Sequence, residues 1–201
     1  MKPLLLDLPM PIMTPRLVLR PPRVGDGVIV NAAVLESFDQ LHPFMPWARK
    51  KQSPEETEEF VRQAAANWIL KKSEEPWLPL FVFQKETDQF VGSTGFHNID
   101  WEVPCLETGY WIRNRCAGQG LMTEAVNALT QYALKQLRVK RIAITCDINN
   151  IRSRKIPERL GYQLEATLKA NRISAANSEV SDTLVYARYD SGQLPILTIS
   201  Y

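Results

Sequence analysis

The sequence predicts a mixed α/β fold, of the α+β kind, with one central β-sheet of about seven strands flanked by about four helices. Its 201 residues suit one domain, and a hydrophobic content of 45% supports one sizeable core. Strand and helix patterns follow in the order β α α β β β α β α β β, which is typical of helices packed around a single sheet. We place the domain at residues 14–190, between an N-terminal extension at 1–13 and a C-terminal tail at 191–201.

The first strand and helix lie just after the proline-rich extension. Arg16–Arg20 alternates polar and apolar side chains, which predicts a half-buried strand. Asp26 is placed to cap a helix running from about Val28 to Phe38. Residues 41–47, rich in proline and aromatic side chains, predict a loop.

A capping box begins the second helix. Ser53 is followed by Pro54 at the first helical position and by Glu56 at the third, a combination that marks a helix start. The helix then carries two adjacent apolar stripes. Their members are Phe60, Ala64 and Trp68 on one, and Val61, Ala65 and Ile69 on the other.

Three strands are predicted next, at residues 78–84, 90–96 and 106–112. The polar turn Glu86-Thr87-Asp88 joins the first two as a hairpin. A longer helix begins at Gly120 and ends near Lys135-Gln136. It carries one apolar face, formed by Leu121, Ala125, Leu129 and Tyr132.

The last third of the chain predicts three more strands around a short helix. Residues 141–146 form a compact apolar strand, and a helix at 151–160 ends at Gly161. Residues 162–168 and 179–189 predict the final strands. We expect the apolar tail beyond them to add a strand or to cover a partner subunit.

Composition excludes several classes of protein. The formal net charge is only +2, so no global field favours direct nucleic-acid binding. Three widely spaced cysteines and two histidines give neither a disulfide framework nor a metal site, and they predict reduced thiols in a cytoplasmic protein. No apolar run approaches the ~18 residues of a membrane span. The first strand is not followed by a Gly-x-Gly-x-x-Gly motif, so the sequence does not indicate a dinucleotide-binding fold.

The stretch 109–125 is the part of the sequence that carries chemistry. A strand runs into a loop containing Gly118 and Gly120, and a helix begins at once. Free amides at the helix start and the positive end of its dipole predict a seat for a phosphate or pyrophosphate, to which Arg113 and Arg115 add charge. The loop lacks the Gly-Lys-Ser/Thr of nucleotide hydrolases. Taken alone, two glycines in a loop favour a plain strand–turn–helix in which glycine serves only the geometry.

The loop does not stand alone. Arg115–Gly120 fits the pattern Gln/Arg-x-x-Gly-x-Gly/Ala and so resembles the acyl-CoA pyrophosphate motif of the GCN5-related N-acetyltransferase (GNAT) superfamily. The features that support this resemblance are Gly109-Tyr110-Trp111-Ile112, Asn150-Ile151-Arg152-Ser153 and Leu160-Gly161-Tyr162. Residues 14–20 and 92–100 resemble in particular the RimJ/RimL branch of ribosomal-protein N-terminal acetyltransferases. The resemblance covers about residues 14–190 in order.

This resemblance implies an acetyl-CoA site in the opening between two splayed parallel strands, at residues 106–112 and 141–146. Backbone near Trp111, Ile112 and Arg113 would pair with the pantetheine, and an N–H near Ile112 would polarise the thioester carbonyl. Asn149 or Asn150 would contact the opposite side. The 3′-phosphate would meet Arg113, Arg115 and the basic residues after Asn150, unless those last form only a solvated helix face. The pyrophosphate would lie on the amides of Ala117, Gly118, Gln119, Gly120 and Leu121.

The implied reaction is direct acetyl transfer to a primary amine, with no metal. Glu107 is our candidate general base, with a rim or Arg-pairing role as the alternative. By the resemblance, Ser153 would protonate the leaving CoA thiolate; the alternative is a structural serine, at the N-cap or in the second turn of the helix. The sequence suggests neither a Ser-His-Asp nor a Cys-His arrangement, so we do not expect a covalent acyl-enzyme.

The acceptor we expect is a protein or peptide N-terminal α-amine. An α-amine titrates near ~8 and a lysine amine near ~10.4, so the α-amine needs less help to lose its proton. Phe44, Trp47 and His97 are our candidates for acceptor binding. The alternative for the two aromatic residues is a lid over the core, and the alternative for His97 is a structural role. Residues 168–173 lack the carboxylate that some ribosomal-branch members carry. A small amine, an amino acid or an aminoacyl compound therefore remains an alternative acceptor. A non-catalytic acyl-CoA-binding module remains an alternative function. We expect a monomer or a homodimer.

Overall fold

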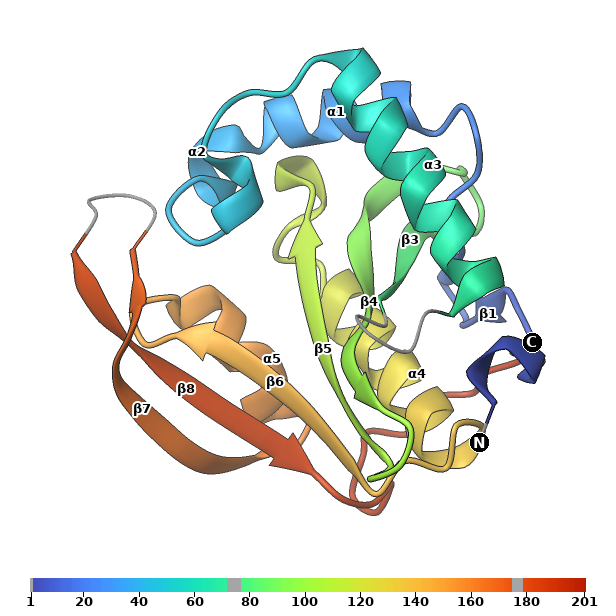
Figure 1. Ribbon diagram of the computed structural model, residues 1–201, viewed down its shortest axis with the longest axis vertical. Helices are drawn as coiled ribbons and strands as arrows, with labels where there is room; N and C mark the ends of the chain where they lie inside the picture. The colour runs from blue at the N-terminus through green and yellow to red at the C-terminus, as the bar shows by residue number, and fades with distance from the viewer. Residues whose placement is uncertain (1, 72–76, 175–178) are drawn as a thin grey trace.

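The protein, described here by a computed structural model, is built on one eight-stranded mixed sheet (Figure 1). The structure describes residues 2–71, 77–174 and 179–201; Met1, the first residue of the predicted extension, lies outside them. In spatial order the strands are β1 (Ile12–Met13), β2 (Leu17–Arg20), β3 (Leu78–Gln84), β4 (Phe90–Asp100), β5 (Cys105–Ile112), β6 (Arg141–Asp147), β8 (Val180–Arg188) and β7 (Gln163–Ile173). The predicted fold class is confirmed. The additional strand, β1, is only two residues long, too short for an alternating pattern to reveal.

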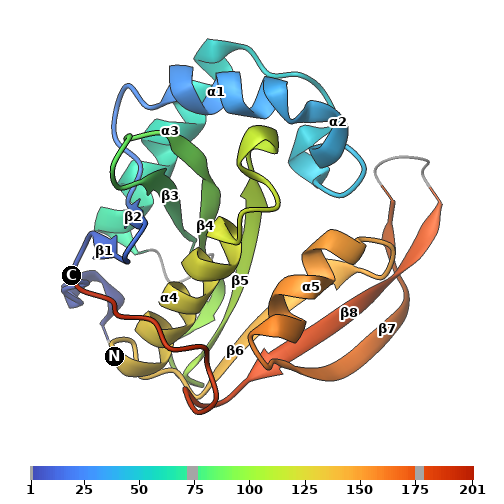
Figure 2. The same cartoon turned by 180° about the vertical axis from the view of Figure 1, so that it is seen from behind.

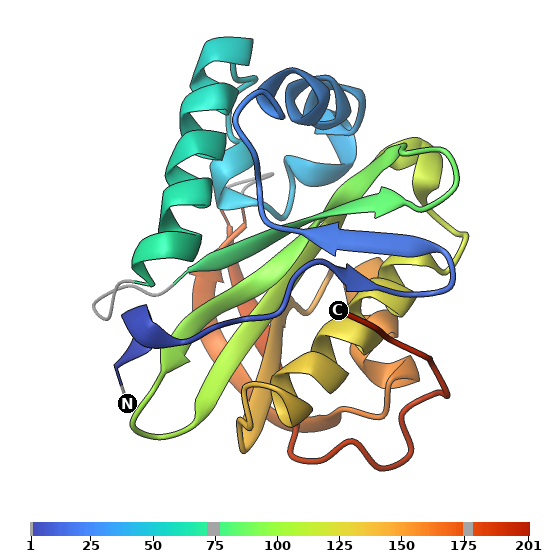
Figure 3. The ribbon, with the colours of Figure 1, turned by 90° about the vertical axis from the view of Figure 1, so that its right-hand side faces the viewer.

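Helices cover both faces of this sheet, as Figure 3 shows. On one face lie α1 (Gly27–Glu36), α2 (Phe38–Leu41) and α3 (Pro54–Leu70); on the other lie α4 (Leu121–Lys135) and α5 (Ile151–Arg159). Each face has its own apolar cluster. Phe81, Phe83 and Phe90 pack with α1, while Leu80 and Val82 pack with α4. No helix in the described part of the chain is long and apolar enough to cross a bilayer.

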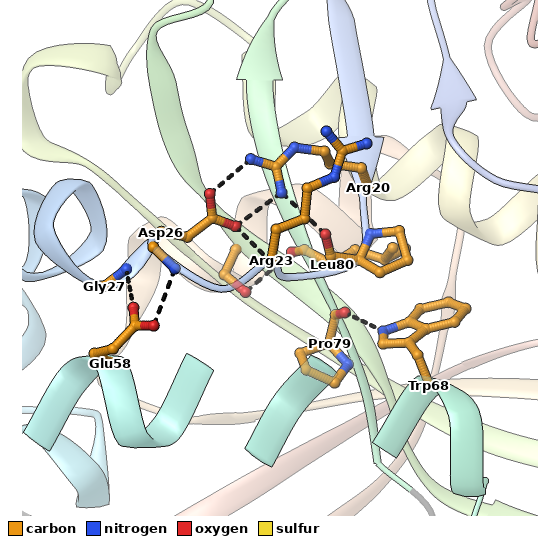
Figure 4. A network of polar contacts seen from close by, with 11 residues as sticks. Arg20, Arg23, Asp26, Gly27, Glu58, Trp68, Pro79 and Leu80 are labelled. Atoms are coloured by element: carbon orange, nitrogen blue, oxygen red, sulfur yellow. Dashed lines mark hydrogen bonds and ion pairs between the residues drawn. The ribbon is translucent and has the colours of Figure 1, made fainter. Parts of the chain in front are cut away.

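The start of α1 departs from the sequence prediction (Figure 4). Asp26 makes no capping hydrogen bond, because its backbone is already helical at φ −67° and ψ −16°. Its carboxylate instead accepts two hydrogen bonds from Arg20, each of 2.8 Å. Glu58 on α3 serves the helix start, accepting from the backbone amides of Gly25 at 2.9 Å and Gly27 at 3.0 Å.

The capping box at Ser53 is confirmed, but the two predicted apolar stripes of α3 are only partly correct. The buried side chains are those of Thr57, Val61, Ala64 and Trp68. Ile69 is 71% exposed and Phe60 is 39% exposed. One narrow stripe of α3 therefore contacts the sheet. Phe60 lies at the edge of this stripe, and its side chain is only partly covered.

The second half of the chain follows the prediction closely. The predicted face of α4 is buried, and β4 and β7 extend a few residues beyond the expected ends. The C-terminal tail lies against its own chain beside α4 and β1 (Figure 2). Asn127 donates to the carbonyl of Pro195 at 2.9 Å, and Met13 and Ser200 exchange backbone hydrogen bonds. The tail thus adds one isolated bridge to the sheet edge.

The two parallel strands of the sheet separate along their length. β5 and β6 pair only at Cys105↔Arg141, Leu106↔Ile142 and Glu107↔Ala143. Beyond these positions β5 stays paired with β4 and β6 with β8, so the two strands diverge (Figure 1). The predicted splayed pair is present, and it interrupts the sheet between Thr108 and Ile112.

Candidate active site

The divergence of β5 and β6 exposes strand backbone in the middle of the sheet. The amide of Arg113 donates to the Val91 carbonyl at 2.8 Å and is thus used within the sheet. Because backbone groups alternate in direction along a strand, the amides of Ile112 and Tyr110 point toward the opposite edge, where β6 has moved away. Ile112 therefore has the orientation that the predicted carbonyl-polarising role requires. The amides of Trp111 and Arg113, predicted to pair with the pantetheine, point toward β4 instead.

A cavity of about 470 Å³ lies at this divergence. Its walls come from α1, α3, the loop at 44–47 and strands β3 to β6, with further residues from α5 and β7. Of the predicted site residues, it brings together Phe44, Trp47, His97, Trp111, Asn150 and Ser153. Residues from both sides of the splay line it, so one space is shared by the two halves of the sheet.

The loop before α4 has the backbone expected of an anion seat. Gly118 and Gly120 have φ values of +78° and +74°, which only glycine adopts easily. Within the described chain, the amides from Gly118 to Thr123 have no hydrogen-bond partner, since the first helical bond is Glu124 N–H to Gly120 C=O. A Cβ added at Gly118 would meet nothing within 4 Å, so the space in front of the loop is open. Free amides beside open space suit a pyrophosphate.

Arg16, to which the sequence prediction gave no role at the site, anchors this loop. Its guanidinium donates to the Gln119 carbonyl at 3.1 Å and to the Glu124 carboxylate at 2.6 Å. Thr14 donates to the same carboxylate at 2.6 Å. The start of β2 is thereby tied to the first turn of α4. No local pattern could show this link, because it joins residues about a hundred positions apart.

Arg113 and Arg115 share a carboxylate, that of Glu36 at the end of α1. Arg113 Nε donates to it at 2.9 Å and Arg115 Nε at 3.0 Å. These bonds, Arg115's above all, lower the pKa of Glu36 to about 2. The positive charge predicted at the mouth of the loop is therefore partly neutralised by a residue that the sequence gave no reason to select.

Glu107 and His97 are opposite each other on β5 and β4. His97 Nε2 lies 3.6 Å from Glu107 Oε2. The histidine, more than any other group, lowers the pKa of Glu107, while partial burial raises it. His97 lines the cavity but Glu107 does not, so a role for Glu107 as the general base requires a relay through His97 or a water molecule.

Ser153 lies on α5, across the splay from Tyr110 on β5. Ser153 Oγ donates to the Tyr110 hydroxyl at 3.2 Å, and that hydroxyl donates to the Ser153 carbonyl at 2.9 Å. Burial raises the pKa of Tyr110, which keeps it protonated. The cap of α5 is Asn150, whose Oδ1 accepts from the Ser153 amide at 3.0 Å, so Ser153 is not the N-cap but a serine of the first helical turn. Tyr110 belonged to the predicted motif Gly109–Ile112, but no individual role was predicted for it.

The end of β6 supplies a carboxylate that residues 168–173 lack. Asp147 is only 5% exposed and accepts hydrogen bonds from Ser181 Oγ at 3.0 Å and the Asn149 amide at 2.8 Å. Arg172 Nε lies 3.8 Å from it, and both side chains line the cavity. The Asn149 side chain turns to Ser181, at 3.3 Å, which leaves Asn150 as the asparagine at the cavity.

Aromatic side chains from β5, α3 and two loops line part of the cavity. Trp47 and Trp111 have ring centres 6.0 Å apart, and Phe60 and Trp77 are 5.2 Å apart. Trp47 was predicted here, whereas Phe60 was assigned to the helix core and Trp77 to no role. In the described ranges, no three His, Cys, Asp or Glu side chains gather to hold a metal ion.

Comparison with known proteins identifies the family. The model of the acetyltransferase (GNAT) domain matches residues 16–163, which include the splayed strands and the whole glycine loop. The chain belongs to the GNAT acetyltransferase family. The resemblance inferred from the loop motif is therefore confirmed at the level of the family.

Among curated relatives, the chain is similar to ribosomal-protein-serine acetyltransferase of Escherichia coli, with 28% identity over 76% of this chain and 81% of the relative. It is 38% identical to putative ribosomal N-acetyltransferase YdaF of Bacillus subtilis, over 35% of this chain and 39% of the relative. Among solved structures, RimL, a ribosomal L7/L12 alpha-N-protein acetyltransferase in complex with coenzyme A, superposes with a TM-score of 0.79. It has 22% identity and covers 92% of this chain and 99% of that chain. This GNAT member thus shares its fold with proteins that act on ribosomal proteins.

Proposed function

We propose that this protein transfers the acetyl group of acetyl-CoA to a primary amine, the N-terminal α-amine of a protein or peptide, in the cytoplasm. The observation that carries the proposal is the cavity at the β5–β6 divergence, next to a loop of free amides. That arrangement suits a long thioester anchored at one end and presented to an acceptor at the other. The names of the curated relatives support the same choice of acceptor.

The chain's own residues suit the binding of acetyl-CoA. The amides of Gly118, Gln119, Gly120 and Leu121 would hold the pyrophosphate. The amide of Ala117, predicted to join them, instead donates to the Asn114 carbonyl at 3.0 Å. The Ile112 amide, turned into the splay, would donate to the thioester carbonyl and stabilise the negative charge that develops there. Asn150 lines the opposite side of the cavity. Arg115 remains half-exposed and available to a phosphate, although it shares Glu36.

In the reaction, the nitrogen lone pair forms a bond to the thioester carbon as the carbon–sulfur bond breaks. The amine loses one proton and the departing thiolate gains one, so protons balance. Glu107, oriented beside His97, would take the amine proton directly or through water. Ser153, held by Tyr110, would supply the thiolate with its proton. An α-amine of pKa near ~8 needs only modest assistance at neutral pH.

A thiol-release assay tests this proposal. The purified chain is incubated with acetyl-CoA and peptides that carry either a free or a formylated N-terminus, and the product is located by mass spectrometry. We expect acetyl on the α-amine and no thiol release from the blocked peptide. Small amines and amino acids form a second panel. Tight acetyl-CoA binding without turnover on either panel would mean a non-catalytic acyl-CoA-binding module.

A further inference from the structure

We propose that the preferred acceptor carries an aromatic or large apolar group beside its amine, and that Trp47, Phe60, Trp77 and Trp111 select it. This inference rests on the proposed function and specifies the substrate class of the same cavity. It differs from what the relatives' names suggest, because a ribosomal-protein-serine acetyltransferase acts on a small, polar residue.

The first argument is the uncovered aromatic surface inside the cavity. Trp47 is 41% exposed and Phe60 is 39% exposed, although both line a concave space. Each is tilted against a second ring, Trp47 on Trp111 and Phe60 on Trp77. Burying such rings against another apolar group is favourable, and aromatic pairs gain further from tilted contacts. A serine side chain would leave most of this surface in water.

The position of Trp111 places this surface near the chemistry. Trp111 directly precedes Ile112, whose amide turns into the splay where the thioester carbonyl is expected. Trp111 also packs on Phe90, so its ring is held from behind, at 5.7 Å between centres. A group attached to the carbon next to the attacking nitrogen would therefore meet the Trp47–Trp111 pair.

Unused hydrogen-bond donors give a second argument. The indole N–H groups of Trp47, Trp77 and Trp111 have no partner in the chain as described, and all three residues line the cavity. By contrast, the indole of Trp68, which belongs to the core, donates to the Pro79 carbonyl at 2.6 Å. A tryptophan at a binding surface combines an apolar body with one donor. Peptide carbonyls of the acceptor are suitable partners.

The charges of the cavity disfavour polycations. Asp147 is the one carboxylate among the described lining residues, and it is already engaged by Ser181, the Asn149 amide and Arg172. No free carboxylate therefore remains to hold a second ammonium group. Polyamines and aminoglycosides carry several ammonium groups, and burying these without carboxylate partners is costly.

The experiment compares peptides that are identical except for the first residue, with Phe, Leu, Ser, Ala or Lys at that position. We expect kcat/KM for Phe to exceed that for Ser by about tenfold, since two aromatic contacts each contribute a few-fold. Trp47→Ala and Phe60→Ala should each raise KM for the Phe peptide about three- to tenfold while KM for acetyl-CoA stays unchanged. Trp47→Phe should restore most of the loss. Ile69→Ala, an exposed change on α3 outside the cavity, is the control.

Three outcomes would overturn the inference. Preference for Ser or Ala would show that the relatives' specificity holds here, with the proposed function intact. Equal losses for the Phe and Ser peptides in Trp47→Ala would mean that the ring serves only as a lid. Acetyl-CoA binding with no transfer to any peptide would refute the proposed function, and the inference with it.

Discussion

Arg16 and Glu124 form a 2.6 Å ion pair that joins the start of β2 to the first turn of α4, across 108 positions of sequence. The same guanidinium holds the Gln119 carbonyl, at 3.1 Å. An arginine that binds both the tip of the loop and the helix behind it fixes how the loop amides point. The glycine-rich turn is thereby restrained at its tip and at the helix behind it.

Replacing Arg16 by Ala should therefore weaken acetyl-CoA binding. We expect KM for acetyl-CoA to rise about three- to tenfold, because an exposed ion pair contributes only up to about 1 kcal/mol and the loop loses one further hydrogen bond. The discriminating measurement is the same variant with acetyl-pantetheine, which lacks the pyrophosphate and should react at the wild-type rate. Arg62→Ala removes a comparable exposed ion pair on α3, and it should change neither the KM for acetyl-CoA nor the rate with acetyl-pantetheine. Equal losses with both thioesters would assign Arg16 a general structural role.

Gly118 offers a direct test of the anion seat. Gly118→Asp and Gly118→Ala both strain the backbone, by about 1–2 kcal/mol, because φ is +78°. Neither meets a steric obstacle at Cβ. Only the aspartate adds negative charge, so calorimetry should show CoA binding lost in Gly118→Asp and only weakened in Gly118→Ala. Matching melting temperatures would confirm that both variants fold. Similar affinities for the two would remove the loop from phosphate binding.

The sequence anticipated those parts of the site that lie close together along the chain. The glycine loop, the strand before it and the Asn150–Ser153 turn are local patterns, and a motif of a few residues carries them. Glu36, Arg16 and Asp147 were missed because their roles depend on partners brought together only by the sheet order. At Asp26 the error is the opposite one, because a local pattern predicted a cap that does not form. The Asp26 carboxylate pairs with Arg20, six positions away, and this ion pair competes with the cap.

Glu107→Gln should lower kcat by about a hundredfold or more if Glu107 is the general base, with a smaller change in KM. The pKa of Glu107 is lowered below 4.5, chiefly by His97, so the carboxylate is ionised throughout the neutral range. The activity limb that reports its protonation therefore lies below pH 4.5. A limb near pH 8 belongs to the acceptor amine and should persist in the variant. Wild-type turnover in Glu107→Gln would exclude Glu107 from the mechanism.

Ser153 and Tyr110 should act as a pair. Ser153→Ala should slow transfer about tenfold while acetyl-CoA affinity changes little, because a thiol of pKa near ~8.5 is a fair leaving group without help. Tyr110→Phe keeps the ring but removes the hydroxyl that Ser153 contacts at 3.2 Å, and should reproduce the smaller kcat. The double variant should be no slower than Ser153→Ala alone. Additive losses would show that the two hydroxyls work independently, and a large loss of binding would make Ser153 a binding residue.

Glu36 should make the stability of the protein depend on acid pH. Its pKa falls from 4.5 to about 2 on folding, mainly through the hydrogen bond from Arg115, so the folded state favours the ionised carboxylate. The stabilisation is complete above pH 4.5 and is lost as the pH falls toward about 2. Glu36→Gln should thus lower the free energy of unfolding at pH 7, with the difference from wild type vanishing near pH 2 in chemical denaturation. Glu59→Gln, on the exposed side of α3 and without an ion pair in the described chain, is the control. A pH-independent difference would mean that Glu36 acts through packing, and that Arg113 and Arg115 do not depend on its charge.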